Sequence, residues 1–170
     1  SCCGNVYNDI YLDEDVTVSA ACGETLTLGS ATGGSSGTGT LISQNAAGDD
    51  LFFTGAGTLK LGADDMLDNS TATLDLDIAG GTLDTGGFDQ GTSANPVGNL
   101  TLDAGSTIQL GNGDHSLFFS DVANAGALTI TNWAGTAAMS GTAGKLFSST
   151  NLSAGELANI TFTGPYAPGA

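Results

Sequence analysis

Short stretches in which leucine alternates with threonine or another polar residue recur from one end of this chain to the other. The dipeptide Thr-Leu begins at Thr25, Thr27, Thr40, Thr58, Thr73, Thr82 and Thr101. Successive side chains of a β-strand point to opposite faces, so this period of two places leucine on a buried face and threonine on a solvent face. Turn-forming glycines separate the stretches, as at Gly80-Gly81 and Gly111-Asn112-Gly113. The pattern predicts an all-β protein of short strands.

Two architectures fit short strands separated by glycine-rich turns: a β-sandwich and a β-solenoid. The strands resemble one another as Gly-x-Leu-x-Leu units, which is expected when each coil stacks on a near copy of itself. Their spacing is irregular, so no strict repeat is present. We expect a β-solenoid. The alternative is a β-sandwich completed by a strand from a neighbouring subunit.

The charge balance is strongly acidic, with 18 Asp and Glu residues against two lysines, Lys60 and Lys145, and a formal net charge of −16. Such a chain is repelled by nucleic-acid phosphates and anionic lipid head groups, so neither is expected as a partner. No apolar run of about 18 residues is present, so no membrane insertion is expected. The remaining partners are other copies of the chain, glycans or other cell-surface polymers, and divalent cations.

The cysteines lie near the N-terminus, at Cys2, Cys3 and Cys22. The chain starts at Ser1 rather than methionine, which suggests that a signal peptide has been removed and that the protein is secreted. In an oxidising compartment, one of the two adjacent cysteines is expected to pair with Cys22, because a disulfide between neighbours is strained. The other would be free or bonded to a neighbouring molecule. Three reduced, buried cysteines are the alternative.

A helical signal occurs near the C-terminus, where Ser153 and Glu156 have the spacing of a capping box and Leu152 and Leu157 that of a hydrophobic staple. A short helical turn is predicted there, followed by a last strand over residues 160–163. We therefore divide the chain into an N-terminal strand segment with a cysteine staple (1–25), a solenoid domain (26–163) and a Pro/Gly tail (164–170).

Few residues suggest specific chemistry. His115 is the single histidine and is predicted to be a solvated turn residue, since no nucleophile motif accompanies it. A calcium site of oxygen ligands is conceivable at Asp64, Asp65, Asp68 and Asn69, although no EF-hand spacing is present. Outward threonines could bind ice only as a regular array, and we expect Asp and Lys to interrupt it. No catalytic residue is predicted, and no other cofactor.

Several segments resemble the autotransporter-associated β-strand repeat and the closing module of bacterial exoproteins with a PEP-CTERM-type sorting signal. The resemblance covers roughly residues 50–166 and rests on residues 57–67, 80–88, 98–108, 128–133 and 152–162. It implies a right-handed parallel β-helix on an exported surface protein, with no catalytic residue to carry over. In that family the chain would continue into a sorting peptide, which is not part of this sequence.

These observations favour a non-enzymatic structural subunit of an extracellular bacterial fibre. The strand predicted at Val6, Asn8, Ile10 and Leu12 could pair with a neighbouring subunit by β-augmentation, and a spare cysteine could lock that joint. The alternative is a monomeric surface adhesin or display module that binds glycan or another surface. A third hypothesis is a glycan hydrolase, which would need two carboxylates close together in a cleft.

Overall fold

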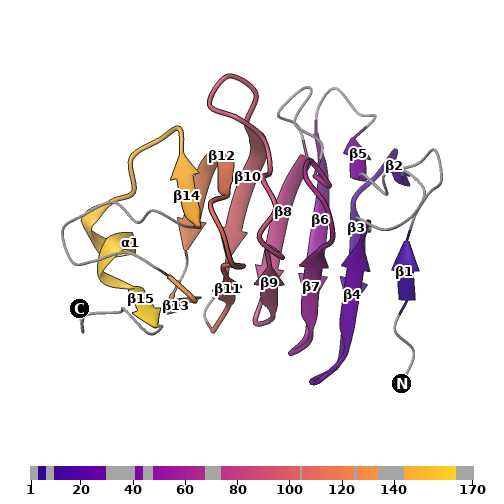
Figure 1. The fold of residues 1–170 in the computed structure, drawn as a ribbon, viewed down its shortest axis with the longest axis horizontal. Helices are drawn as coiled ribbons and strands as arrows, with labels where there is room; N and C mark the ends of the chain where they lie inside the picture. Colours follow the sequence, from indigo (N-terminus) through magenta and orange to yellow (C-terminus); the bar gives the residue numbers. More distant parts are fainter. Residues whose placement is uncertain are drawn as a thin grey trace.

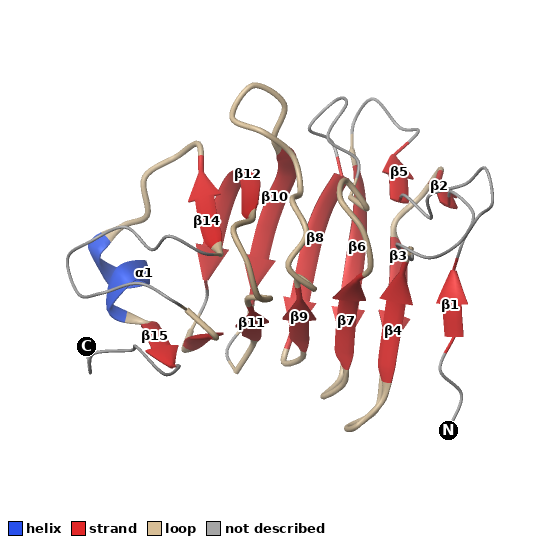
Figure 2. Cartoon of the chain, in the orientation of Figure 1, coloured by secondary structure: helices blue, strands red, loops and turns tan. Residues whose placement is uncertain are grey.

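The computed structural model describes residues 4–6, 10–29, 41–43, 48–67, 74–103, 105–124, 126–133 and 144–163. Over these residues the protein is almost entirely β-structure, with one short helix (Figure 2). Its elements in chain order are β1 (Gly4–Val6), β2 (Ile10–Leu12), β3 (Val16–Ser19), β4 (Thr25–Leu28), β5 (Leu41–Ser43), β6 (Asp49–Thr54), β7 (Thr58–Leu61), β8 (Leu74–Ala79), β9 (Thr82–Asp84), β10 (Val97–Leu102), β11 (Thr107–Gln109), β12 (Ser116–Asn124), β13 (Leu128–Thr131), β14 (Lys145–Ser148), α1 (Ala154–Ala158) and β15 (Ile160–Thr163).

The strands form two large sheets in which neighbouring strands are parallel. One sheet has seven strands in the order β1-β4-β7-β9-β11-β13-β15, and the other has six in the order β14-β12-β10-β8-β6-β3. From β6 to β14 the chain alternates between the two sheets, and strands follow one another in chain order along the long axis (Figure 1). Two successive strands, one from each sheet, together with their turns are called a coil below. A third, two-stranded sheet pairs β2 with β5. The prediction of an all-β protein is confirmed.

The buried face of the seven-stranded sheet carries one continuous column of apolar side chains. The pairing register aligns Leu26, Leu59, Leu83, Ile108, Ile130 and Phe162 across successive strands. Facing residues of the six-stranded sheet, such as Leu76 and Leu100, are equally buried. A buried leucine or isoleucine contributes roughly 1.5–3 kcal/mol relative to an exposed one. The alternation of leucine and threonine is therefore what positions the core between the sheets.

The solvent face of the same sheet carries an uninterrupted column of threonines. Strand register aligns Thr25, Thr58, Thr82, Thr107, Thr129 and Thr161. The adjacent column reads Thr27, Lys60, Asp84, Gln109, Thr131 and Thr163. The expected interruption by Lys and Asp is therefore correct for one column and wrong for the other, because register and not sequence order decides which threonines become neighbours.

The N-terminal segment differs from the prediction. The expected strand from Val6 to Leu12 is two short strands, β1 and β2, and each already pairs within the chain, with β4 and β5. Leu12 is buried in the core, whereas Asn8 lies outside the described residues. The domain boundary predicted after residue 25 falls inside β4, and β3 pairs with β6 across it. Long-range parallel pairing joins this segment to the rest of the sheets.

The C-terminal helical signal is confirmed. Ser153 caps α1, its hydroxyl accepting from the amide of Glu156, while the Glu156 carboxylate accepts from the amide of Ser153. Hydrogen bonding of the Glu156 carboxylate to the Ser153 side chain first, and to the Ser153 amide second, lowers the pKa of Glu156 from its usual value. The predicted last strand is β15. The tail at 164–170 lies outside the described residues.

One turn brings two backbone segments into direct contact. A Cβ added at Gly111 would overlap the backbone nitrogen and Cα of Gly87, one coil earlier. Gly87 has a φ of 89°, in the left-handed region that favours glycine. Close stacking of these turns requires glycine at both positions, and it brings neighbouring polar side chains into the interior.

Candidate functional site

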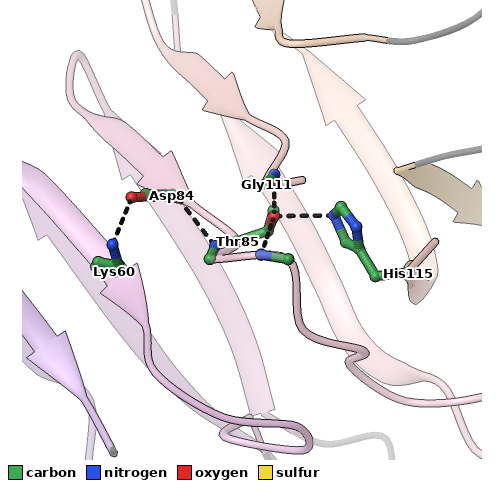
Figure 3. Close-up of polar contacts among 7 residues, drawn as sticks. Lys60, Asp84, Thr85, Gly111 and His115 are labelled. Carbon is green, nitrogen blue, oxygen red and sulfur yellow. Dashed lines mark hydrogen bonds and ion pairs between the residues drawn. The ribbon is translucent and has the colours of Figure 1, made fainter. Parts of the chain in front are cut away.

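His115 and Thr85 form a buried polar pair between adjacent coils (Figure 3). His115 is only 1% exposed, and its Nε2 lies 2.9 Å from Thr85 Oγ1. The same hydroxyl oxygen accepts from the amides of Gly111 (2.9 Å) and Gly87 (3.3 Å). The prediction that His115 is a solvated turn residue is therefore wrong. Stacking of the glycine turns carries the ring inward, a long-range effect that local turn composition does not reveal.

The hydrogen bonds assign the tautomer of the His115 ring. Two backbone amides use the acceptor positions of the Thr85 hydroxyl, so its proton points to His115 Nε2. His115 Nδ1 then carries the ring proton and donates it to the carbonyl of Gly113, 3.2 Å away. Every polar atom of the ring has a partner and the ring is closed to solvent. This arrangement joins coils, and it offers no route by which a substrate would reach the ring.

Both lysines form ion pairs on the surface. Lys60 Nζ lies 3.4 Å from Asp84 Oδ2, between adjacent strands of the seven-stranded sheet (Figure 3). The other Asp84 oxygen accepts from the amide of Gly86 at 2.9 Å. Lys145 Nζ lies 2.7 Å from Asp114 Oδ1, and this hydrogen bond, followed by the charge of Lys145, lowers the pKa of Asp114. The exposed Lys145–Asp114 pair contributes little stability, whereas the Asp84 residue of the other pair is buried, at 7% exposure.

The candidate calcium ligands have structural roles. Asp64 Oδ1 accepts from the amide of Asp89 at 2.8 Å, and Asp65 Oδ1 accepts from the amide of Gly91 at 3.1 Å. The carboxylate of Asp89 in turn accepts from Ser116 on the next coil. In the described part of the chain, no three His, Cys, Asp or Glu residues cluster as metal ligands do. Asp68 and Asn69 lie outside that part, so the calcium site stays a prediction.

Acidic side chains line up along the solvent face of the six-stranded sheet. Asp50 pairs with Asp75 in register, its backbone amide donates to Asp15, and Asp77 lies on the same strand as Asp75. Partial burial, followed by the charges of Asp15, Asp75 and Asp77, raises the pKa of Asp50 above its usual 3.8. Like charges directly opposite each other destabilise a strand pair, so this column costs stability at neutral pH.

Asp50→Asn is expected to stabilise the protein at pH 7 by roughly 0.2–1 kcal/mol. The raised pKa means that folded Asp50 keeps its proton to higher pH than unfolded Asp50. Stability therefore falls as pH rises through the unfolded pKa toward the folded one. The stabilisation by Asp50→Asn should vanish well below pH 3.8, where wild-type Asp50 is neutral in the folded and in the unfolded protein. Urea denaturation at pH 7 and at low pH measures this difference.

Asp13→Asn is the matched control, because Asp13 is exposed and the change in net charge is the same. Equal stabilisation by both variants would attribute the effect to overall charge and contradict the proposed cost of the column. Added salt should reduce the Asp50→Asn gain, since it screens repulsion between partly exposed groups.

Each end of the sheets has strands with one unpaired edge among the described elements. At the N-terminal end these are β1 and β3, and at the C-terminal end they are β15 and β14. Figure 1 shows the two pairs at opposite ends of the long axis. A row of unpaired backbone amides and carbonyls can template pairing with another chain. The ends are therefore the part of the fold best able to bind another protein.

The C-terminal end is also apolar. An open cavity of about 290 Å³ lies there, with walls that include Ile130, Trp133 and Leu152. Three large apolar side chains at its margin are substantially exposed: Phe162 at 36%, Phe147 at 40% and Leu157 at 56%. Trp133 and Phe162 contact with ring centroids 4.9 Å apart. Sequence analysis did not single out this cluster, although the apolar Phe162 in the last strand was a usable signal.

Helix α1 covers part of this end. The side-chain amide of Asn124 donates a hydrogen bond to the backbone carbonyl of Glu156 in α1, at 3.1 Å. Asn124 ends β12, so α1 lies against the six-stranded sheet, whereas the outer edge of β15 has no neighbouring strand among the described elements. None of the residues of α1 is buried. The helix is thus a partial cover whose apolar surface stays open to solvent.

Cys22 lies exposed between β3 and β4, and its thiol is bonded to no cysteine within the described residues. Cys2 and Cys3 lie outside the described residues, so their pairing with Cys22 stays a prediction. No helix within the described residues is long and apolar enough to cross a membrane.

Comparisons with known proteins returned no match: no family model, no curated protein and no solved structure is similar to this chain.

Proposed function

We propose that this protein is a non-enzymatic structural subunit of an extracellular bacterial fibre, assembled head to tail through β-strand contacts. The observation that carries the proposal is that, among the described strands, the two parallel sheets have unpaired edges at both of their ends. The two ends of a parallel stack are different surfaces, so contact between them is heterologous. Heterologous contacts that do not close into a ring produce filaments.

The finer architecture that we infer is a right-handed parallel β-helix. Alternation of consecutive strands between two parallel sheets supports it, and parallel crossover connections are almost always right-handed. The resemblance to the autotransporter-associated repeat favours the same fold. A conventional β-sandwich is built from antiparallel strands, whereas the strand pairs of the large sheets are parallel.

Export to the cell surface is part of the proposal. Cysteines near the N-terminus and the resemblance to bacterial exoproteins support it. The net charge of −16 opposes association at low ionic strength. Fibre growth is therefore expected to need salt or divalent cations that screen the carboxylates.

Negative-stain electron microscopy of the purified protein, at low and physiological salt, tests this function. We expect unbranched fibres of uniform width at physiological salt and few at low salt. Parallel samples with calcium and with reductant show whether either contributes to the joint. Discrete particles under every condition, with a monomer mass by sedimentation, would overturn the proposal.

One observation favours the alternative, a monomeric adhesin or display module. Helix α1 covers the six-stranded sheet at the C-terminal end, as a capping element would. If the protein stays monomeric, binding to an array of neutral glycans becomes the next measurement. Selective binding there would support the adhesin.

A further inference from the structure

The inner column of the seven-stranded sheet ends in residues of very different size. At its C-terminal end is Phe162, which aligns with Ile130 and is 36% exposed at the margin of the apolar cavity. At its N-terminal end is Gly4, which aligns with Leu26. Glycine adds no side chain to the column, so the apolar part of the column stops at Leu26. One end carries an exposed ring, and the other lacks a side chain in the same column.

The N-terminal end has an opening of its own. A cavity of about 320 Å³ lies beside Leu26 and is lined also by Val18 and Ala20. All three are partly buried side chains packed against the core. Glu24, Ser19 and Thr25 also line this cavity. The column that ends at Gly4 therefore borders a partly exposed surface whose apolar part a large apolar side chain would bury.

Charge and direction agree with a contact between these ends. β1 (Gly4–Val6) and β15 (Ile160–Thr163) contain no charged residue, in a chain with a net charge of −16. Strands within the sheet are parallel, so a second copy displaced along the long axis presents β1 to β15 in parallel orientation. Helix α1 contacts the other sheet through Asn124, and its Leu157 lines the same cavity as Phe162, so α1 borders the joint and would pack against the second copy.

We propose that β15 of one copy pairs in parallel with β1 of the next, with Phe162 opposite Gly4 and Thr163 opposite Asn5. The inference rests on the proposed head-to-tail assembly and specifies its joint. In this joint Phe162 packs over Gly4, which adds no side chain to the column, and is buried together with Trp133. The seven-stranded sheet, with the threonine column on its solvent face, then continues from one subunit into the next.

Engineered disulfides test this register. Paired strands lie about 4.8 Å apart, a Cα separation that a disulfide spans. We would introduce Asn5→Cys and Thr163→Cys together, in a background with Cys2, Cys3 and Cys22 replaced by serine. Oxidation of assembled protein is expected to yield a ladder of covalent multimers. The two positions lie at opposite ends of the seven-stranded sheet, so a bond within one chain is excluded (Figure 1).

The matched control is Asn5→Cys with Thr161→Cys, two residues out of register. It should give few multimers, and comparable ladders from both pairs would overturn the register. Circular dichroism and fibre formation before oxidation confirm that each variant folds and assembles. Fibres that form without cross-linking in the first pair would overturn this joint while leaving head-to-tail assembly intact. Absence of fibres from the wild-type protein would overturn both.

A second measurement needs no cysteine. Phe162→Ala is expected to raise the critical concentration for fibre growth about tenfold or more, as loss of a central aromatic anchor does. Phe88→Ala is the control, because Phe88 is partly exposed in the turn after β9, the middle strand of the seven-stranded sheet, away from this joint. Equal effects of the two substitutions would contradict the role of Phe162, provided that both variants match the wild type in thermal unfolding.

Discussion

Replacing Thr85 with valine is expected to lower the free energy of unfolding by about 3 kcal/mol, although the two side chains have nearly the same shape. The hydroxyl of Thr85 is the shared partner of the Gly87 and Gly111 amides and of His115 Nε2. Valine leaves these groups without that partner: His115 Nε2 is then buried and unpaired, and the amides of Gly87 and Gly111 are partly buried. Each buried polar group left unsatisfied costs roughly 1–3 kcal/mol. Urea denaturation followed by circular dichroism measures the loss.

Thr82→Val is the control for this prediction. Thr82 belongs to the outer threonine column and is partly exposed. Its side chain makes none of the hydrogen bonds described between coils. Its replacement by another β-branched residue should change stability by less than about 0.5 kcal/mol. A Thr85→Val protein as stable as the wild type would show that the His115 network does not hold the coils together.

Gly111→Ala is expected to destabilise the protein by roughly 1–3 kcal/mol or more. The added methyl group would overlap the backbone of Gly87, which cannot rotate away as a side chain can. Relief requires the two turns to separate, and that would weaken the hydrogen bond from the Gly111 amide to Thr85. Thermal unfolding and urea denaturation measure the change. Because the same turns position His115, its ring should become more accessible to hydrogen exchange.

Gly155→Ala is the matched control for the glycine substitution. Gly155 lies in α1, and the nearest atom to an added Cβ is Ser153 Oγ at 3.9 Å. Alanine has the higher helix propensity, so this variant should be unchanged or more stable by up to about 1 kcal/mol. Similar destabilisation by both substitutions would indicate that loss of glycine flexibility, and not contact between turns, is responsible.

In the proposed fibre, assembly would depend on a balance between the apolar C-terminal end and an acidic surface. Phe162, Leu157 and Phe147 are exposed at one end, while the acidic column around Asp50 runs along the six-stranded sheet. Burial of the apolar side chains favours contact between copies, and repulsion between the carboxylates opposes it. Added salt screens the repulsion between carboxylates, so the salt dependence of fibre growth distinguishes the two contributions. Asp50→Asn should lower the salt concentration that fibre growth requires.

Local patterns in the sequence determined the elements of this protein. Alternating leucine and threonine was sufficient to predict strands such as β7 and β9, because the period of side chains along a strand is a property of neighbouring residues. The spacing of Ser153 and Glu156 was sufficient to predict α1, because a capping box closes within one helical turn.

Tertiary structure alone decided which residues meet between coils. The inward position of His115, the hydrogen bonds of Asp64 and Asp65, the threonine column and the pairing of β1 with β4 all join residues more than twenty positions apart. Loops of unequal length separate the coils, so equivalent positions do not recur at a constant interval, and the alignment is set when the two parallel sheets pack around one core. A shift of one residue in register would turn every side chain to the opposite face, and burial of the leucine column selects the single register in which these contacts form.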